Sequence, residues 1–525
     1  MKLFNFFRKS SKAQTRNMSQ RKYAAASINR LNADWVTSVL SADSELYNDL
    51  RTLRSRSREL CMNNDYARRF LKRTGVNVIG ATGIRLQVKA KDNSGKLLRE
   101  INSHIEEQFH LWAKKGNCSV CGKLSWVDSQ KLFLESVARD GEVIVRLVKG
   151  FDNDFGFALQ FLEADHLDED LNMPLDNGGY IRMGIEFNKW NRPVAYHLLS
   201  HHPSEVFHDK TSYEKKYQRI PASEIIHGFL IDRPSQSRGV PWMHTAMPRL
   251  RMLAGYEEAE LVAARVGASK MGFFVSPDGT GYAGSEHEND SPIMEADPGT
   301  FEQLPSGMDV RMFDPNHPAG NFASFEKAIL RGVASGLDIS YNTLANDLED
   351  VNFSSIRHGS LEDRDSWKVL QNWVIEHFCR PVFEAWLLMS ITSGKIEISA
   401  TDFDKFNKPV WRARGWAWVD PLKENHANQI AINQKTKTRA QVAADQGMDV
   451  EELFQQLAFE DELAKEYGLD LNTARYREDR DRDKQLDRSS LDGDSKLDNN
   501  SENDNIYEYK YKHRSREKDH DTDDE

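Results

Sequence analysis

The sequence is poor in cysteine and has no long apolar run. Its 525 residues include four cysteines, which are too few for a disulfide scaffold and favour a reducing compartment, the cytoplasm. The most apolar stretch, residues 373–389, holds four charged or imidazole side chains, so it does not predict a membrane-spanning helix. Arg8 and Lys9 interrupt the brief apolar patch at the start of the chain before a signal peptide could form. We therefore expect neither secretion nor membrane insertion.

Positive charge is not in excess either. The chain has 70 Lys and Arg against 81 Asp and Glu, a net charge of −11. That sign argues against a protein that grips nucleic acid over its whole surface, because phosphates are bound by Lys and Arg. The exception is residues 1–30, with eight Lys or Arg and no acidic residue. We interpret this segment as a flexible basic arm, which stays mobile until something anionic holds it.

The common catalytic signatures are missing. The chain has no GxxxxGK[ST] loop, no GxSxG elbow and no HExxH motif, so neither P-loop ATP hydrolysis nor these hydrolase mechanisms are predicted. Cys118 and Cys121 have the spacing of half a zinc site, but no second Cys or His pair follows at a suitable distance. We expect two ordinary thiols, no cofactor and no enzymatic activity.

One acidic cluster leaves an enzymatic function open. The segment 163–170 (EADHLDED) contains five carboxylates and one histidine, groups that bind Mg²⁺ or transfer protons. The alternative function is a Mg²⁺-dependent enzyme acting on nucleic acid, with Asp165 among the ligands. Acidic residues after a β-prone run more often solvate a turn, and that interpretation is favoured.

The pattern along the chain predicts an α+β protein with charged ends. Short β-prone runs occur at 141–148, 157–162, 180–187 and 193–199, separated by Asp, Asn, Gly and Pro. A helix is expected from about Met243 to Val266, and helices again from about 423 to 470. Residues 273–319 are irregular, and residues 471–525 have too few aliphatic side chains to form a core.

The most informative stretch is residues 320–386. Apolar residues at three- and four-residue spacing predict a helix that ends near Gly336, and a second helix with Trp367, Leu370, Val374, Phe378 and Val382 on one stripe. Pro381 is expected to kink or end that second helix. The large aromatic side chains there are expected in a core or an interface between copies. Between the helices, residues 338–355 are expected to form a loop long enough to need a functional explanation.

This stretch resembles the portal proteins of tailed bacteriophages, in particular the lambda-like family. Further matching segments follow in the same order: 58–68 (RELCMNNDYAR), 77–87 (NVIGATGIRLQ), 140–146 (DGEVIVR), 163–167 (EADHL), 221–227 (PASEIIH), 238–242 (RGVPW) and 415–421 (GWAWVDP). The resemblance covers about residues 35 to 470, and the order of the segments makes it specific. It implies a ring, usually of twelve copies, at one capsid vertex, with DNA passing through a central channel.

The resemblance also implies a division of the chain into portal parts. In order these are a basic arm (1–30), an α+β wing (31–244), a stem helix (245–268), a clip (269–320), a second stem helix (321–337), a tunnel loop (338–355), a long wing helix with the completion of the wing (356–424), a helical crown (425–470) and a disordered charged tail (471–525).

Candidate channel residues follow from this division. A channel must confine DNA without binding it, and each phosphate that is neutralised by Lys or Arg strengthens the binding of DNA. We therefore expect Glu257 and Glu260 to face the bore. Uncharged contacts with the duplex are expected from the loop residues Tyr341, Asn342, Leu344 and Asn346. The alternatives are an outward-facing helix side and a loop that contacts a neighbouring copy.

The expected partners follow from the same resemblance. They are further copies of the chain in a ring, twelve as is usual in the family, double-stranded DNA in transit, the terminase large subunit, major capsid and scaffold proteins, and head–tail connector proteins. The basic arm of residues 1–30 either stays solvated or contacts DNA, scaffold or capsid shell. The expected location is the portal vertex of the virion, with the host cytoplasm during assembly. A capsid adaptor without a channel is the other structural alternative.

Overall fold

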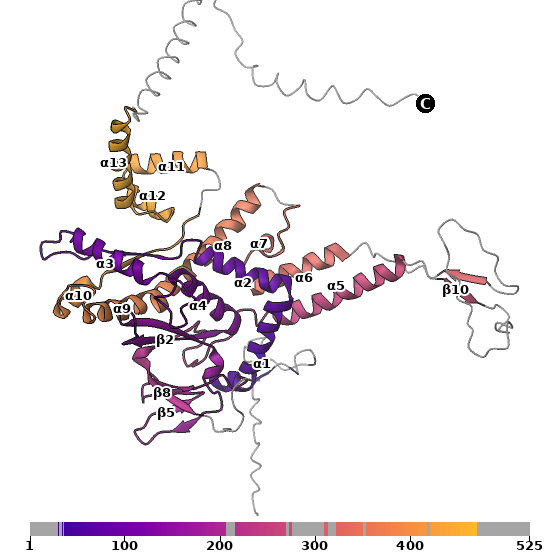
Figure 1. The fold of residues 1–525 in the computed structure, drawn as a ribbon. Coiled ribbons are helices and arrows are strands. Elements are labelled where there is room, and N and C mark those ends of the chain that lie inside the picture. Colours follow the sequence, from indigo (N-terminus) through magenta and orange to yellow (C-terminus); the bar gives the residue numbers. More distant parts are fainter. Residues whose placement is uncertain are drawn as a thin grey trace, which may run out of the picture. The chain divides into compact units, whose positions relative to one another are not determined.

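The computed structural model describes residues 30, 34, 36–205, 216–268, 272–275, 309–312, 322–349, 353–416 and 421–469. The chain divides into two compact units, with the boundary between Ala427 and Asn428. The basic arm, most of the expected clip and the charged tail lie outside the described residues. The mixed helix and strand content confirms the α+β class (Figure 1).

The helices of the first unit are α1 (Ala42–Asn63), α2 (Asp65–Val78), α3 (Arg99–Trp112), α4 (Trp126–Asp140), α5 (Met247–Ala268), α6 (Phe322–Gly336), α7 (Tyr341–Ala345), α8 (Phe353–Val374), α9 (Arg380–Thr392) and α10 (Phe403–Phe406). Polar caps fix several helix starts. Asn64 accepts a hydrogen bond from the Ala67 N–H and so separates α1 from α2. Ser125 and Asp128 form a capping box at the start of α4. Gly141 ends α4 in the left-handed region, at φ 88°.

The strands form four antiparallel sheets among the described residues. One sheet has the order β3 (Phe157–Leu162), β2 (Glu142–Lys149), β9 (Ile225–Phe229). A second sheet has the order β4 (Met173–Pro174), β5 (Tyr180–Arg182), β6 (Ile185–Phe187), β7 (Pro193–Leu199), β8 (Tyr217–Pro221). The two remaining sheets each have two strands, β1 (Arg85–Val88) with β12 (Pro409–Arg412), and β10 (Gly272–Val275) with β11 (Asp309–Met312). The run 180–187, taken as one β-prone segment, is a tight hairpin, because Met183 (φ 46°) and Gly184 (φ 82°) turn the chain.

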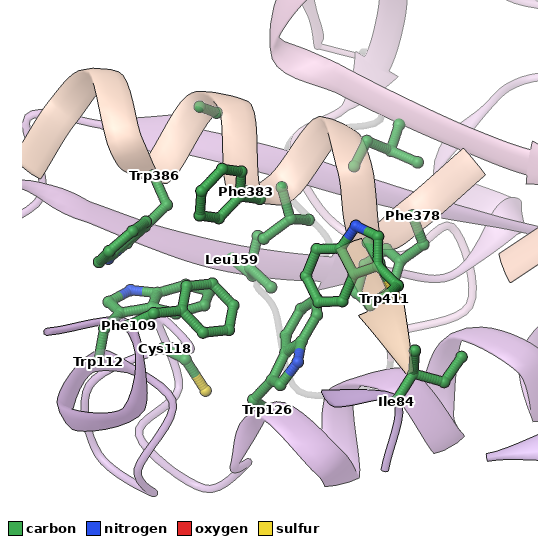
Figure 2. Close-up of a cluster of buried hydrophobic side chains, with 14 of the residues drawn as sticks. Ile84, Phe109, Trp112, Cys118, Trp126, Leu159, Phe378, Phe383, Trp386 and Trp411 are labelled. Carbon is green, nitrogen blue, oxygen red and sulfur yellow. The ribbon is translucent and has the colours of Figure 1, made fainter. Parts of the chain in front are cut away.

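An aromatic core lies between α3, α4, α9 and the β2–β3 sheet (Figure 2). Phe378 stacks on Trp126 at 5.2 Å and on Phe133 at 4.4 Å between ring centroids. Trp386 is fully buried and meets Phe109 edge to face at 4.9 Å. The expectation that the large aromatic residues of 320–386 pack in a core or an interface is confirmed as a core for Trp367, Phe378 and Trp386, and Trp373 packs partly buried against it.

Pro381 does not end the second helix of the 320–386 stretch. The chain widens into a π-helical turn at Ile375–Cys379 and continues as α9, which has Pro381 in its first turn. A proline inside a helix removes one N–H donor and its ring presses on the carbonyl four residues earlier. A π turn directly before it gives that ring room, so the helix continues in a changed register.

The helices α5 and α6 run side by side (Figure 1). Tyr256 of α5 meets Phe325 of α6 edge to face at 5.0 Å, and Arg249 donates to the carbonyl of Gly332 at 2.9 Å. A second core cluster contains Leu250 near the start of α5 and Leu330 near the end of α6. Together with other buried residues, the cluster packs these two ends against α2. Both regions expected to be helices from residue spacing are helices.

The second unit begins within α11 (Pro421–Asn433) and contains α12 (Arg439–Asp445) and α13 (Val450–Glu466). Thr438 and Gln441 form a capping box at the start of α12, and Asp449 caps α13. The expected helices of 423–470 are therefore present.

Candidate functional site

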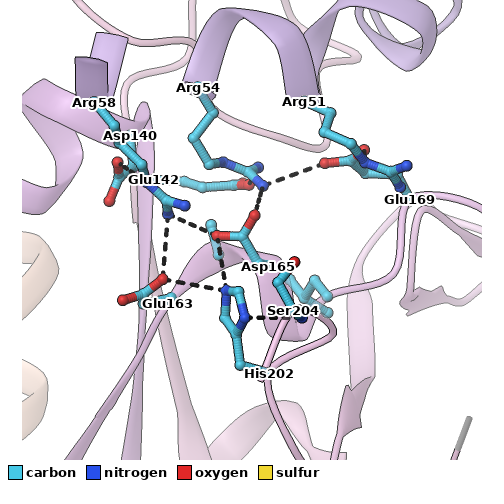
Figure 3. Close-up of polar contacts among 12 residues, drawn as sticks. Arg51, Arg54, Arg58, Asp140, Glu142, Glu163, Asp165, Glu169, His202 and Ser204 are labelled. Carbon is cyan, nitrogen blue, oxygen red and sulfur yellow. Dashed lines mark hydrogen bonds and ion pairs between the residues drawn. The ribbon is translucent and has the colours of Figure 1, made fainter. Parts of the chain in front are cut away.

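The acidic cluster 163–170 is neutralised by arginines from α1 (Figure 3). Arg54 lies 3.2 Å from Asp165 and 3.3 Å from Glu169. Arg58 approaches Asp165 to 2.6 Å, and Arg51 lies 3.4 Å from Glu169. The three arginines are spaced at i, i+3 and i+7, so they lie along one face of the helix. The cluster therefore joins α1 to the sheet region as a network of ion pairs.

The centre of this network is the fully buried carboxylate of Glu142, at the start of β2. Arg238 donates to it through Nη2 at 2.6 Å and through Nε at 2.9 Å, and Arg54 Nη2 donates at 2.8 Å. His227 Nε2 lies 2.9 Å from Oε2, the oxygen that also accepts from Arg238 Nε. Burial alone would raise the pKa of Glu142, but Arg238 and His227 outweigh it and hold that pKa well below its ordinary value. Glu142 is thus a buried anion shared by two arginines.

The contacts of Glu142 connect β2 and the β5–β6 hairpin to the segment that leads into α5. Arg238 also donates to the carbonyl of Met183 at 3.0 Å. The backbone of Gly239 passes so close to Gly141 that a Cβ at either glycine would overlap backbone atoms. The direction in which the chain enters α5 is therefore determined by buried charge and close backbone packing.

The geometry does not support a metal centre in the acidic cluster. Glu163, Asp165 and His202 each bring one possible ligand atom within 4.8 Å of the others. However, the Arg58 guanidinium already lies 2.6 Å from Asp165 and 3.5 Å from Glu163. The Ser204 N–H donates to His202 Nδ1 at 3.1 Å, so in the neutral ring Nε2 carries the proton and faces Glu163 at 3.4 Å. A cation and an N–H thus occupy the position that Mg²⁺ would need.

The two closely spaced cysteines differ in environment. Cys118 is buried and its thiol donates to the Leu124 carbonyl at 3.2 Å, whereas Cys121 is exposed. Neither thiol belongs to a cluster of three metal-ligating groups within the described part of the chain. The half zinc site noted in the sequence is not completed there.

The segment expected to be a tunnel loop is anchored to α8 by Asp363. It contains the short helix α7, so the expectation of an uninterrupted loop over 338–355 is wrong for Tyr341–Ala345, and α8 already begins at Phe353. Asp363 is buried and accepts hydrogen bonds from Ser340 N at 2.7 Å, from Ser340 Oγ at 2.8 Å and from Thr343 Oγ1 at 2.7 Å. The start of α7 is therefore held by one carboxylate.

The end of α7 is held from α2. Arg69 donates to the Thr343 carbonyl at 2.9 Å and to Asn346 Oδ1 at 3.0 Å. Asn346 takes the left-handed conformation, φ 60°, that often follows a helix. Tyr341 donates to Asp347 at 2.8 Å, and burial together with that carboxylate raises the pKa of Tyr341 to about 12. The segment is thus held by two neighbouring elements, α8 and α2, and by its own Tyr341–Asp347 contact.

These contacts decide what each candidate loop residue can do. Leu344 is fully buried in the core beneath α7, so the expectation that it touches DNA is wrong for this conformation, and its role is packing. Tyr341 and Asn342 are half-buried, and Asn346 is occupied by Arg69 while remaining exposed. A contact with DNA stays a prediction for Tyr341, Asn342 and Asn346.

The candidate bore residues of α5 also have partners in their own chain. Glu257 is half-buried beside Tyr66 and Glu326, and burial together with the Glu326 carboxylate raises the pKa of Glu257. Glu260 interacts with the Tyr256 hydroxyl. Glu258, between them, is exposed. A location in a bore stays a prediction for Glu257 and Glu260.

Comparison with known proteins identifies the family. The model of the family described as "Phage portal protein, lambda family" matches residues 29–371, which include α1 to α7 and most of α8. The chain belongs to the lambda family of phage portal proteins. The portal family is a family of structural proteins of the phage particle.

Two relatives show how far the similarity to portal proteins extends. The chain is 37% identical over 456 residues to a probable portal protein of Halomonas phage phiHAP-1, covering 86% of this chain and 88% of the relative. It is 20% identical over 478 residues to the portal protein of Escherichia phage N15, covering 83% and 88%.

A solved structure is also similar. It is the neck of an empty gene transfer agent (GTA) particle, at TM-score 0.41 and 10% identity, covering 79% of this chain and 97% of that chain.

Among the described residues, no helix combines the length and apolar character needed to span a bilayer.

The residues that organise these sites were not singled out from the sequence. Glu142 and Arg238 lie in two of the portal-like segments and Asp363 stands in the charged run 362–365, but only their burial and partners mark them. The arginine face of α1 had a readable signal in its i, i+3, i+7 spacing, but the spacing does not say which carboxylates it meets.

Proposed function

We propose that this protein forms a closed ring at the unique vertex of a phage capsid and that double-stranded DNA passes through the ring during packaging and ejection. The observation that carries the proposal is the lambda-family portal match, which spans both paired helices and the anchored α7 segment. A ring needs a head-to-tail contact between two different faces of each copy, and twelve copies are the expected number.

The parts of the ring are assigned from the order of the elements. In this proposal α5 and α6 are the stem helices, the α7 segment is the tunnel loop, and α8 with α9 forms the long wing helix. The clip falls in residues 269–320 and docks the terminase large subunit and, later, the head–tail connector proteins. The crown comprises the helices of 425–470. The virion vertex is the final location, and capsid and scaffold proteins surround the ring during assembly in the host cytoplasm.

The proposed channel would act passively. Its net charge of −11 disfavours tight capture of a polyanion, since no excess of Lys and Arg is present to release counterions from DNA. The acidic part of α5, with Glu257, Glu258 and Glu260, is proposed to line the bore. The α7 segment would contact the duplex through Tyr341, Asn342 and Asn346, whose positions are set by Asp363 and Arg69.

Negative-stain electron microscopy of the purified full chain tests the ring. We expect annular particles with a central hole, and twelve copies by native mass spectrometry. A chain that stays monomeric, even with its capsid and scaffold partners present, would refute the proposal. Compact oligomers without a hole would instead favour an adaptor.

Reversing the charge at the bore tests the channel. The double variant Glu257→Lys/Glu260→Lys is expected to form rings and to slow DNA packaging, because two added cations per copy bind phosphate. The matched control Glu257→Gln/Glu260→Gln removes charge without adding attraction and is expected to package at a rate closer to the unmodified protein. Equal DNA filling by both variants and the unmodified chain would contradict the bore assignment.

A further inference from the structure

The helix α13 of the second unit carries large apolar side chains at exposed positions. Phe454 is 50% exposed, Leu457 46% and Phe459 64%, whereas Ala464 is the buried residue of this helix. A unit as small as residues 428–469 has little core of its own, and small units commonly need a partner to become stable. We therefore expect another protein surface to pack against the exposed apolar side chains of α13.

The exposed apolar residues lie on two sides of α13. Phe454 and Leu457 are three apart and share one side, which adjoins buried Ala464. Phe459 and Leu463 are four apart, and Phe459 lies roughly 140° around the helix from Phe454 at 3.6 residues per turn. A single flat partner covers only one side of a helix. Two apolar sides fit a helix that meets a neighbour on each side, as in a ring.

The charges of the second unit show which surfaces are complementary. Along α13 the charged residues are Glu451, Glu452, Glu460, Asp461, Glu462, Lys465 and Glu466. The connection 434–439 between α11 and α12 carries Lys435, Lys437 and Arg439 and no acidic residue. Lys437 is paired with Asp445 of its own unit at 2.6 Å, whereas Lys435 and Arg439 are exposed. Acidic side chains thus predominate on α13 and basic side chains on the connection 434–439.

We propose that α13 of one copy packs against the α11–α12 connection of the next copy, so that the second unit forms a head-to-tail interface between copies of this chain. Half-exposed Ile430, at the end of α11, offers apolar surface beside the basic connection. A symmetric contact of α13 with α13 would bring acidic residues together, which electrostatic repulsion disfavours. The head-to-tail arrangement places acidic residues on basic ones and leaves a second contact face for a further neighbour. This inference rests on the proposed ring.

Charge reversal in two separate full-length variants tests the contact. The acid-reversed variant carries Glu460→Lys, Asp461→Lys and Glu462→Lys, and the base-reversed variant carries Lys435→Glu and Arg439→Glu. All five positions are exposed, so circular dichroism and the thermal midpoint should match the unmodified chain. Each variant alone is expected to need about tenfold or more protein for half-assembly, because like charges meet at every contact.

Mixing the two variants gives the decisive result. In an alternating ring, each acid-reversed helix meets a base-reversed connection, and each native helix meets a native connection. A 1:1 mixture is therefore expected to regain assembly at the unmodified concentration, and native mass spectrometry should show equal numbers of both variants in each ring. Failure of the mixture to assemble, or unimpaired assembly of either variant alone, would overturn the proposal.

Replacing apolar residues of α13 by serine provides an independent test of the contact. Phe454→Ser/Leu457→Ser should weaken assembly, whereas the matched control Gln455→Ser/Gln456→Ser on the same helix should leave it unchanged. Equal assembly of both variants would mean that another protein, or the first unit, covers α13. If the unmodified chain forms no ring, the proposed function itself fails, whereas normal rings from every variant refute only this interface.

Discussion

Glu142→Ala is expected to destabilise the fold by about 3–5 kcal/mol, the range for breaking a buried ion pair from one side. The substitution leaves Arg54 and Arg238, both fully buried, without their shared carboxylate. Because these residues join α1, β2 and the segment entering α5, the loss should appear as a lower thermal midpoint and as little assembled protein. Thermal or urea denaturation of the purified chain measures it.

The matched control is Glu163→Ala. Glu163 belongs to the same network, at 3.5 Å from Arg58, but its side chain is 58% exposed. Exposed ion pairs contribute little to stability, so this variant should resemble the unmodified protein. Equal behaviour of the Glu142 and Glu163 variants would show that the buried network does not hold α1 and β2 to the segment before α5.

The contribution of Glu142 also depends on pH. Its pKa in the folded chain lies well below the ordinary value of 4.5, so the stabilisation is present above that value and is lost as pH falls toward the folded pKa. The difference in stability between the unmodified chain and Glu142→Ala should therefore be constant near neutrality and shrink in acid. A difference that grows as pH falls would contradict the ionised state of Glu142.

Asp363→Ala is expected to leave the ring intact and to reduce DNA packaging by roughly tenfold or more. The carboxylate accepts three hydrogen bonds that position the start of α7. Hydrogen bonds to a charged group contribute about 1.5–3 kcal/mol each, and 1.4 kcal/mol corresponds to a factor of ten in the population of the anchored conformation. Counting DNA-filled heads in a packaging reaction, with rings counted by electron microscopy, separates the two effects.

Asp365→Ala serves as the control for Asp363. Asp365 lies two residues further along α8, its side chain is 77% exposed, and it pairs only with Lys368 among the contacts described for it. Its loss should change neither assembly nor packaging. Normal packaging by the Asp363 variant would show that α7 does not need its anchor, and a loss of rings would show that Asp363 serves assembly instead.

Several helices and strands were predictable because their signals are local, whereas α3, α4 and the strands outside the four β-prone runs were not predicted. The apolar spacing in 320–336 predicted α6 within a residue or two at each end, and β-prone runs predicted β2, β3 and β7. The helix α7 was missed because its five residues are too few to show a period. Ser340, which caps it, is a local signal, but much of its anchoring comes from Asp363, on another helix.

The candidate sites were less predictable than the fold. The segment 163–170 has the composition of a metal site, but its carboxylates are paired with arginines more than a hundred residues earlier in the chain. Leu344 stands among polar residues in the sequence and was therefore expected at a surface, although it packs into the core between α2, α6 and α7. In both cases the deciding partner is distant in sequence.

The sequence by itself determined the portal family, the α+β class and the positions of α5, α6 and α8, because the order of motifs and the spacing of apolar residues can be read along the chain. Only the tertiary structure decided which charged residues are buried and paired, which loop is anchored, and which apolar residues of α13 remain exposed. These properties depend on distances between segments far apart in the chain. Electrostatic energy and burial are functions of such distances, and sequence spacing does not contain them.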